Sequence, residues 1–341
     1  MKQASLYFTA PRRVEIREGP LPSPAAGQVL VRTLFSAISP GSELLAYRGL
    51  CPDDVPLDKT IPAFSAPFRF PARYGYSVVG RVISCGRDVP SDWENRFVFA
   101  FHPHESHFLA RPAELHGLPP DISPEEALFL PALETAVNFT MDGRPMIGER
   151  VIVFGQGIVG LLTTAMLAGH PLGCLITLDP EALRRRFSLM AGADASLDPF
   201  EPGVLDALPA RLGSKEPWGG ADLVYEISGT PEALEQALAV TGFSGRVVIG
   251  SWYGRKKANL NLGGRFHRSR IRLISSQVSS ISPELTGRWT KARRLEAVWS
   301  LLKKADPVRF VTHRFPFAQA AQAYACLDET PGASVQVILT Y

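Results

Sequence analysis

The chain has 341 residues, of which 45% are hydrophobic and 20% charged, and it carries a formal net charge of +3. This balance is ordinary for a protein that buries a core, so disorder and collagen-like structure are excluded, and the length predicts two domains. The longest run of like charge is the three arginines at 184–186. We therefore expect no nucleic acid partner.

The distribution of apolar residues and cysteines indicates the compartment. The opening residues lead into short alternating segments without the apolar stretch of a signal peptide, and the most apolar run, 158–168, is too short to cross a bilayer. The four cysteines are scattered without metal or disulfide spacing, which is typical of a reducing compartment. We therefore expect a cytoplasmic protein that does not bind a membrane.

Residues 1 to about 127 contain short apolar segments separated by turns. Proline and glycine stand at the joints between them, a pattern typical of an irregular β barrel. The predicted strands cover 14–16, 28–32, 77–83 and 96–101.

From Pro124 the pattern changes to strands alternating with helices. Helices are predicted over 125–130, 134–142, 158–168, 181–191 and 232–240, and strands over 150–154, 175–178, 222–225, 246–249 and 271–274. Strands that alternate with helices of this length predict a parallel sheet with right-handed crossovers. A polar loop after 277, a helix over 291–303, and a terminal helix and strand follow.

A glycine-rich motif, Gly155-Gln156-Gly157-Ile158-Val159-Gly160, stands between the first of these strands and its helix. Gly155 permits the tight turn, Gly157 lets the backbone approach a pyrophosphate, and Gly160 allows close packing of helix on sheet. The N-terminus of the helix offers free N–H groups and a positive dipole end to the phosphates. The motif therefore predicts a dinucleotide site, and the alternative is that its glycines only shape a turn.

Asp179, at the end of the next strand, lies 24 residues after Gly155, close to the spacing that this motif requires. Its carboxylate would accept hydrogen bonds from the adenosine ribose and repel a 2′-phosphate, which favours NAD over NADP. Arg184 and Arg185, one helical turn further on, could instead hold a 2′-phosphate. We therefore expect NAD, with NADP as the alternative.

Several segments together resemble the medium-chain dehydrogenase/reductase superfamily, which contains zinc alcohol dehydrogenases and zinc-free quinone and enoyl reductases. They are 40–43 with Gly49, 75–80, the glycine motif, 191–194, 228–229, 245–250 and 316–317. The resemblance covers nearly the whole chain. It implies an α/β protein in which 1–127 and 279–341 form a GroES-like irregular β-barrel catalytic domain. Residues 128–278 would form a Rossmann domain with a doubly wound parallel sheet, and substrate would bind in the cleft between the two.

The resemblance also implies cofactor contacts beyond the three glycines. Arg184 matches a basic residue that usually follows the acid by five positions, and Gly250 and Ser251 match the strand end that lies against nicotinamide. Thr135 lies on a helix that lines the same region. The predicted cofactor residues are Gly155, Gly157, Ile158, Val159, Gly160, Asp179, Arg184, Ser228, Gly229, Gly250, Ser251 and Thr135.

The chain departs from the zinc-dependent members at the metal ligands. Pro40 stands in place of their cysteine, Tyr76 in place of the histidine and Ser77 in place of the acid. Proline and tyrosine cannot form the thiolate–imidazole pair that a catalytic zinc requires. The four-cysteine lobe of a structural zinc is also missing, because no cysteine occurs between Cys85 and Cys174. We therefore expect no zinc.

Without zinc, a developing alkoxide or enolate needs a protein donor or a general acid. The resemblance places Ser42 at a hydroxyl proton relay and directs the Tyr76 and Ser77 hydroxyls toward the vacated metal site. Glu43 and Glu134 match positions near that site and could act as acid or base if burial raised their pKa. Four of the five have structural alternatives: a helix cap for Ser42, a volume-filling role for Tyr76, a salt bridge for Glu43 and a surface charge for Glu134.

Two further segments carry candidate contacts. His102 and His104 would share one face of a strand, a spacing that metal sites can use. The resemblance matches this strand to the cleft edge, where either ring could instead contact substrate. The long, proline-rich loop 50–73 is predicted to shape the pocket. Its aromatic residues, Phe64, Phe68 and Phe70, either indicate a sizeable, partly apolar ligand or pack beneath the loop.

Three functions follow from these observations. The first, which we predict, is zinc-independent hydride transfer between NAD(H) and an alcohol/carbonyl substrate, a small molecule bound in the interdomain cleft. The second is an NAD(P)H-dependent enoyl or quinone reductase, and the third is a non-catalytic nucleotide-binding protein. A homodimer is also expected, because superfamily members commonly join Rossmann sheets edge to edge, here through 246–251 or the strand 272–276.

Overall fold

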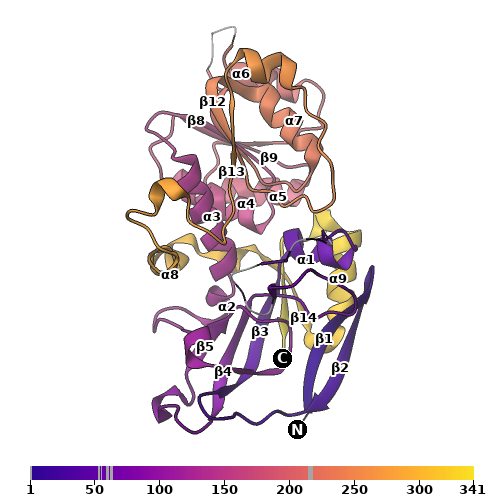
Figure 1. Cartoon of the computed structure of the whole chain (residues 1–341). Coiled ribbons are helices and arrows are strands. Elements are labelled where there is room, and N and C mark those ends of the chain that lie inside the picture. The colour runs from indigo at the N-terminus through magenta and orange to yellow at the C-terminus, as the bar shows by residue number, and fades with distance from the viewer. Residues whose placement is uncertain (1, 53, 55, 59–60, 62–63, 214–217) are drawn as a thin grey trace. The chain divides into compact units, whose positions relative to one another are not determined.

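The computed structural model describes all residues except 1, 53, 55, 59–60, 62–63 and 214–217. The chain divides into two units, which we call the terminal unit (residues 1–131 and 299–341) and the central unit (residues 132–298). Figure 1 follows the chain by colour, from the indigo N-terminal strands through the magenta and orange central unit to the yellow C-terminal segment.

Both ends of the chain build the terminal unit. β1 (Lys2–Ala10) and β2 (Arg13–Pro20) pair as an antiparallel hairpin. Seven strands of the described chain form a second, mixed sheet in the order β14-β15-β3-β4-β5-β7, with β6 paired to β3. These strands are β3 (Val29–Ile38), β4 (Val78–Cys85), β5 (Phe97–Ala100), β6 (His107–Ala110), β7 (His116–Gly117), β14 (Val311–Pro316) and β15 (Gln336–Thr340). The antiparallel pairing of β15 with β3 joins the C-terminal segment to the N-terminal one.

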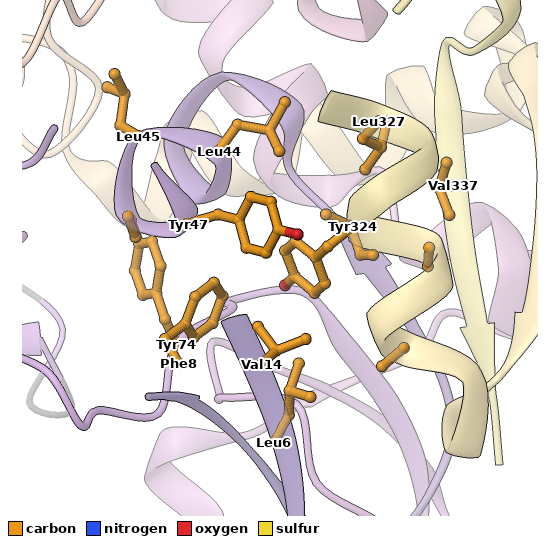
Figure 2. Packing of buried hydrophobic residues seen from close by; sticks show 14 of the residues in the cluster. Leu6, Phe8, Val14, Leu44, Leu45, Tyr47, Tyr74, Tyr324, Leu327 and Val337 are labelled. Atoms are coloured by element: carbon orange, nitrogen blue, oxygen red, sulfur yellow. The ribbon is translucent and has the colours of Figure 1, made fainter. Parts of the chain in front are cut away.

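Helices α1 (Pro40–Tyr47), α2 (Pro124–Ala127) and α9 (Ala320–Glu329) belong to the terminal unit. Between α1 and α9 the Tyr47 and Tyr324 rings stack, with centroids 5.3 Å apart, and Phe8 meets Tyr324 edge to face (Figure 2). Phe64 and Phe68 are buried in the same cluster. These two aromatic residues therefore pack beneath the loop 50–73, while the predicted role of its residues 53, 55, 59–60 and 62–63 lies outside the described chain.

The central unit is built on the predicted parallel sheet. Its described strands stand in the order β10-β9-β8-β11-β12-β13, and every neighbouring pair is parallel. They are β8 (Arg150–Phe154), β9 (Cys174–Leu178), β10 (Ala195–Leu197), β11 (Ala221–Glu226), β12 (Thr241–Ile249) and β13 (Arg272–Ser275). The order reverses between β8 and β11, which is the doubly wound topology that binds dinucleotides at the carboxyl ends of its strands.

The helices that accompany this sheet are α3 (Leu130–Gly143), α4 (Ile158–Ala168), α5 (Ala182–Met190), α6 (Val204–Arg211), α7 (Pro231–Val240) and α8 (Lys291–Ala305). β8 and α4 have the predicted bounds. The prediction missed several elements, among them β1, β10, α6, β14 and α1. The last begins with Pro40 and Gly41, residues that favour a turn from sequence although proline is well tolerated in the first turn of a helix.

Three expectations differ from the structure. β5 ends at Ala100 and β6 begins at His107, so His102 and His104 lie in a loop and not on one face of a strand. β12 has a neighbour on both sides and offers no free edge, whereas β13 ends the described sheet. Residues 279–298 group with the central unit and 128–131 with the terminal unit, and Arg294 on α8 bonds to Glu134 on α3 within the central unit.

Short helices lie in the connections. In the terminal unit they are η2 (Ser91–Trp93), η3 (Pro112–Glu114), η6 (Pro307–Phe310), η7 (Phe317–Gln319) and η8 (Pro331–Ala333), and in the central unit η4 (Leu262–Phe266) and η5 (Pro283–Leu285). Within the described chain, no helix combines the length and apolar character needed to cross a membrane.

Candidate active site

The three glycines of the motif have different surroundings. Gly155 has a φ of +90°, and a Cβ there would lie 2.6 Å from the Ser228 Cα. A Cβ on Gly160 would lie 2.0 Å from the Gly155 carbonyl oxygen, so neither position accepts a side chain without movement of backbone. A Cβ on Gly157 would meet nothing within 4 Å. The first and third glycines are thus required by packing, and the second presents open backbone.

This open backbone leads directly into α4. Gly157 is the N-cap residue, with no side-chain cap, and Ile158 and Val159 are the first two residues of the helix. The first N–H groups of a helix have no partner within the helix, and the helix dipole makes this end positive. The arrangement fits the diphosphate of a dinucleotide, which Gly157, Ile158 and Val159 would hold through their N–H groups.

Asp179 follows β9 and lies against the glycine motif. Its Oδ2 accepts a hydrogen bond from Gln156 N at 2.7 Å and its Oδ1 one from Glu181 N at 2.9 Å. Burial raises the pKa of the Asp179 carboxyl, against the opposing effect of Arg184, whose Nη1 lies 3.9 Å from Oδ2. A carboxylate has about four acceptor sites, so both oxygens keep capacity for ribose hydroxyls.

The Arg185 side chain is bonded to the backbone of the turn after β9. Its Nη1 donates to the Asp179 carbonyl oxygen at 2.9 Å and the Pro180 carbonyl oxygen at 2.6 Å, and it lies 3.2 Å from Asp198 Oδ2. The guanidinium therefore braces the turn after β9, where the sequence left open a role in holding a phosphate.

The predicted nicotinamide-side residues also come together within the central unit. Ser251 Oγ accepts a hydrogen bond from Gly229 N at 2.8 Å, which joins the loops after β11 and β12. A Cβ on Gly250 would lie 2.3 Å from Phe139 Cζ, so α3 packs closely on this strand end. Thr135 stands one helical turn before Phe139, and residues four apart share a helix face.

In the terminal unit, the hydroxyl of Tyr76 reaches the N-terminus of α1. It donates to Ser39 Oγ in a short hydrogen bond and lies 3.4 Å from Ser42 Oγ. Burial raises the pKa of the Tyr76 phenol, and its bonds to the two serines partly oppose that shift. The structure thus joins Tyr76 and Ser42 and adds Ser39, which sequence reasoning did not single out.

Glu43 is fully buried, and its structural partner is a histidine. Its Oε1 accepts from Ser39 N at 2.8 Å, and its Oε2 accepts from the Tyr324 hydroxyl and lies 2.9 Å from His104 Nε2. The other ring nitrogen, His104 Nδ1, lies 2.8 Å from Ser36 Oγ. These contacts hold the start of α1 and, through it, the two serines that face Tyr76.

Gly75 makes room for this histidine. It has a φ of +104°, and a Cβ there would lie 2.4 Å from the His104 ring atoms Cδ2 and Nε2. His104 has no exposed surface and both of its ring nitrogens have protein partners, so the structure gives it a structural role and does not support the substrate contact that the sequence also allowed.

Ser77 and Glu134 have structural partners. Ser77 Oγ donates to the Leu128 carbonyl oxygen at 2.6 Å, so its hydroxyl does not join that of Tyr76 as expected. Glu134 is 6% exposed, and its Oε1 accepts from Arg294 Nη2 at 2.8 Å. Glu134 is therefore not a helix-surface charge, since Arg294 has no exposed surface either.

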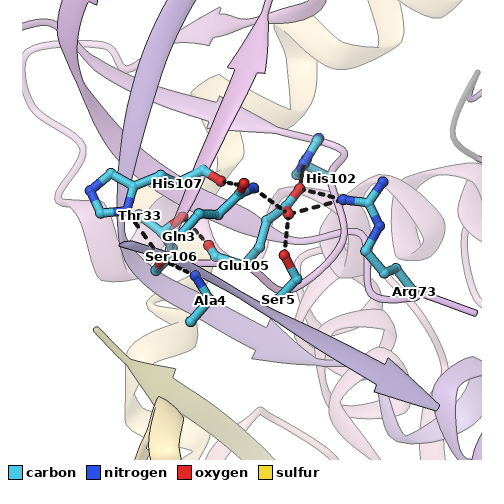
Figure 3. Close-up of polar contacts among 9 residues, drawn as sticks. All are labelled: Gln3, Ala4, Ser5, Thr33, Arg73, His102, Glu105, Ser106 and His107. Carbon is cyan, nitrogen blue, oxygen red and sulfur yellow. Dashed lines mark hydrogen bonds and ion pairs between the residues drawn. The ribbon is translucent and has the colours of Figure 1, made fainter. Parts of the chain in front are cut away.

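Glu105 contacts His102, the other histidine that the sequence singled out (Figure 3). It is 1% exposed, and its Oε2 accepts from Ser5 Oγ at 2.8 Å and Arg73 Nη1 at 3.0 Å, while its Oε1 contacts His102 Nε2. The His102 ring also stacks on Phe108, with centroids 4.1 Å apart. His102 thus contacts Glu105, whereas His104 contacts Glu43. The described residues include no group of three or more potential metal ligands.

Sequence reasoning missed a buried acid at the carboxyl edge of the sheet. Glu226 ends β11, is 0% exposed, and accepts from Ser228 N at 2.9 Å and from the Tyr253 hydroxyl. The available signal was an acid at the end of an apolar strand, two residues before Ser228.

No family model matches the chain. D-guloside 3-dehydrogenase of Escherichia coli K12 is 25% identical over 359 residues, which cover 98% of this chain and 99% of the relative. An alcohol dehydrogenase of E. coli CFT073, solved with NADH, has a TM-score of 0.79 at 18% identity and covers 100% of this chain and 99% of that one. 2R,3R-butanediol dehydrogenase of Bacillus subtilis has the same TM-score at 19% identity, with 99% of each chain covered. These relatives and neighbours are alcohol dehydrogenase-type members of the medium-chain dehydrogenase/reductase superfamily, and the fold is the predicted one.

Proposed function

We propose that this enzyme, a medium-chain dehydrogenase/reductase, transfers hydride between NAD(H) and an alcohol/carbonyl pair without zinc, with the Tyr76 hydroxyl as proton donor. The observation that carries the proposal is the contact of this hydroxyl with Ser39 and Ser42. Tyr76 stands where the zinc-dependent members have a histidine ligand, and its phenol hydroxyl contacts two serine hydroxyls.

The central unit supports a nicotinamide dinucleotide as cofactor. Solved structures of the same fold hold NADH in one case and NADP in another. Here the buried carboxylate of Asp179 lies beside the glycine motif, and Arg185 is occupied by the backbone of the turn after β9. A negative charge at the ribose position repels a 2′-phosphate, so this arrangement favours NAD.

The donor chemistry of the terminal unit supports catalysis without zinc. Pro40 has no side-chain ligand atom, and the hydroxyl of Ser77 is bonded to a backbone carbonyl. Catalytic zinc sites use three protein ligands drawn from thiolate, imidazole and carboxylate groups. Tyr76, Ser39 and Ser42 offer only neutral hydroxyls in their place.

A bound NADH would supply the hydride in the direction of reduction, and Tyr76 would supply the proton. The carbonyl carbon of the substrate gains the hydride while the developing alkoxide takes the phenolic proton. The Tyr76 phenol is protonated at neutral pH, as a general acid requires, and the burial that raises its pKa also makes it a weaker proton donor. The Ser39 and Ser42 hydroxyls can then rotate to donate to the phenolate, which solvent later reprotonates.

The substrate class that we propose is a secondary alcohol or its ketone, in a polyol or sugar-like molecule. The support comes from relatives named for D-guloside, L-threonine, sorbitol and (R,R)-butanediol, each of which carries a secondary hydroxyl. Turnover of quinones or enones faster than of any ketone would contradict this class and favour the enoyl or quinone reductase alternative.

The test of the proton donor is Tyr76→Phe in an NADH-dependent ketone reduction. We expect kcat to fall about 10²- to 10⁴-fold, the usual contribution of a general acid, while the dissociation constant of NADH is unchanged. Tyr74→Phe removes the same hydroxyl from a buried neighbour and should keep kcat. Wild-type kcat in Tyr76→Phe, or stoichiometric zinc in the purified protein, would contradict the mechanism.

The cofactor preference is tested with Asp179→Asn, which keeps the shape and removes the charge. We expect the wild-type protein to bind NADH at least about tenfold more tightly than NADPH, a difference of about 1.4 kcal/mol. The variant should narrow this ratio, and Asp198→Asn, which alters a nearby acid, should leave it unchanged. Equal affinities in the wild-type protein would show that Asp179 does not select NAD.

We also infer a homodimer joined through β13. This strand ends the described sheet and leaves one side of its backbone without a ladder partner among the described strands. Sedimentation velocity at micromolar concentration should give a dimer, and Leu273→Pro, which removes a backbone donor from β13, should shift it toward monomer.

A further inference from the structure

The buried carboxylate of Glu226 joins two loops at the carboxyl edge of the central sheet. Its Oε1 accepts from Ser228 N at 2.9 Å and from Ser228 Oγ, and its Oε2 accepts from the Tyr253 hydroxyl. Ser228 belongs to the loop after β11, and Tyr253 to the segment after β12. One side chain with no exposed surface therefore fixes both segments.

The backbone of the same residue makes a second set of bonds to the segment after β12. The Glu226 carbonyl oxygen accepts from Gly250 N at 2.9 Å and from Ser251 N at 3.2 Å. Two further bonds tie that segment to Gly229: Gly229 N donates to Ser251 Oγ at 2.8 Å, and Lys256 Nζ donates to the Gly229 carbonyl oxygen at 2.7 Å. Both loops are thus bound to each other as well as to Glu226.

The strand order indicates which half of the cofactor these loops meet. The strand order reverses between β8 and β11, and in doubly wound sheets a dinucleotide binds across that point. The glycine motif after β8 fits the diphosphate and Asp179 after β9 fits the adenosine ribose, so the second nucleotide would extend toward β11 and β12. Gly155 touches this region directly, because a Cβ there would lie 2.6 Å from the Ser228 Cα.

We propose that Glu226 is a positioning residue that holds the two loops, through Ser228 and Tyr253, in the form that receives the nicotinamide half of the cofactor. The proposal rests on the proposed function, since it assumes that a nicotinamide dinucleotide binds. Glu226 acts through the loops and does not touch the reacting atoms. Replacing Glu226 should therefore weaken the binding of the nicotinamide half of the cofactor. The contacts with adenosine and diphosphate, made by the segments after β8 and β9, should be unchanged.

The test compares two ligands by calorimetry: NADH, and ADP-ribose, which lacks the nicotinamide ring. In Tyr253→Phe and Glu226→Gln we expect the dissociation constant of NADH to rise about fivefold to tenfold, the effect of losing one to two hydrogen bonds. The dissociation constant of ADP-ribose should stay within about twofold of wild type. Asp222→Asn is the matched control, because Asp222 lies on the same strand, at its amino end, and should alter neither constant.

The two dissociation constants together decide whether Glu226 positions the nicotinamide half. A parallel weakening of both ligands would show a general structural role and overturn the proposal, as would unchanged NADH affinity in both variants. If Glu226→Gln does not fold, Tyr253→Phe, which removes a single hydroxyl from a half-buried side chain, gives the answer alone. A wild-type protein that binds neither ligand would contradict the proposed function itself, which separates the two failures.

Discussion

The central unit holds the candidate cofactor residues and the terminal unit the candidate proton donor, and the two groups are positioned in different ways. In the central unit the glycine motif acts through backbone: Gly155 and Gly160 are required by close packing, and Gly157 leaves open space. In the terminal unit the Tyr76 hydroxyl is placed by side chains, since Glu43 and His104 hold the start of α1. A backbone site is encoded over a few consecutive residues, whereas a site held by side chains needs partners from distant parts of the chain.

The first prediction sharpens this contrast by asking how much the central unit also depends on one side chain. Arg294→Met leaves Glu134 charged and buried without its partner. We expect the free energy of unfolding to fall by about 3–5 kcal/mol, measured by urea denaturation, because an uncompensated buried charge is costly. The double variant with Glu134→Met should recover much of this loss. An unchanged free energy of unfolding in Arg294→Met would show that the central unit does not depend on this ion pair.

The second prediction separates packing from cofactor contact within the glycine motif. Gly160→Ala should destabilise the protein by about 1–3 kcal/mol, since its Cβ would overlap the Gly155 carbonyl. Gly157→Ala should fold normally but raise the dissociation constant of NADH by about tenfold, equivalent to about 1.4 kcal/mol, because a methyl group would stand in the open space. Equal behaviour of the two variants in thermal unfolding and NADH titration would contradict distinct roles.

The third prediction concerns a carboxylate of the terminal unit. Burial by itself raises the pKa of the Glu105 carboxyl, but the hydrogen bonds from His102 and Ser5 and the charges of His102 and Arg73 together lower it below its ordinary value. A lowered folded-state pKa gives stability that is present above the unfolded value of about 4.5 and is lost as pH falls through the folded value. Glu105→Gln should therefore cost about 2 kcal/mol at pH 7, the scale of a hydrogen bond to a charged group. The cost should shrink in acid, and a cost independent of pH would contradict this assignment.

Sequence reasoning did best where the signal is local. The glycine motif and Asp179 follow strands 24 residues apart, and the structure bonds Asp179 to Gln156 within that motif. The parallel sheet followed from the alternation of strands and helices. The comparisons confirm the fold and the enzyme class, while the absence of zinc, the preference for NAD and the dimer stay predictions.

Long-range pairs were beyond the sequence. Glu43 meets His104, 61 residues away, and Tyr324, 281 residues away, and no spacing rule connects them. For the same reason Ser77 was expected beside Tyr76, although the Leu128 carbonyl takes its hydroxyl. Residue type fixes which bonds a side chain can make, and only the fold determines which partner stands nearby.

Heat should affect the central unit in a particular way. Arg294 with Glu134, and Arg246 with Glu149, are ion pairs removed from water. The hydration of charged groups becomes less favourable as temperature rises, so the penalty for keeping these ions dry falls on warming. The two pairs therefore contribute more near the melting temperature than at room temperature, in a range where the gain from apolar burial has levelled off.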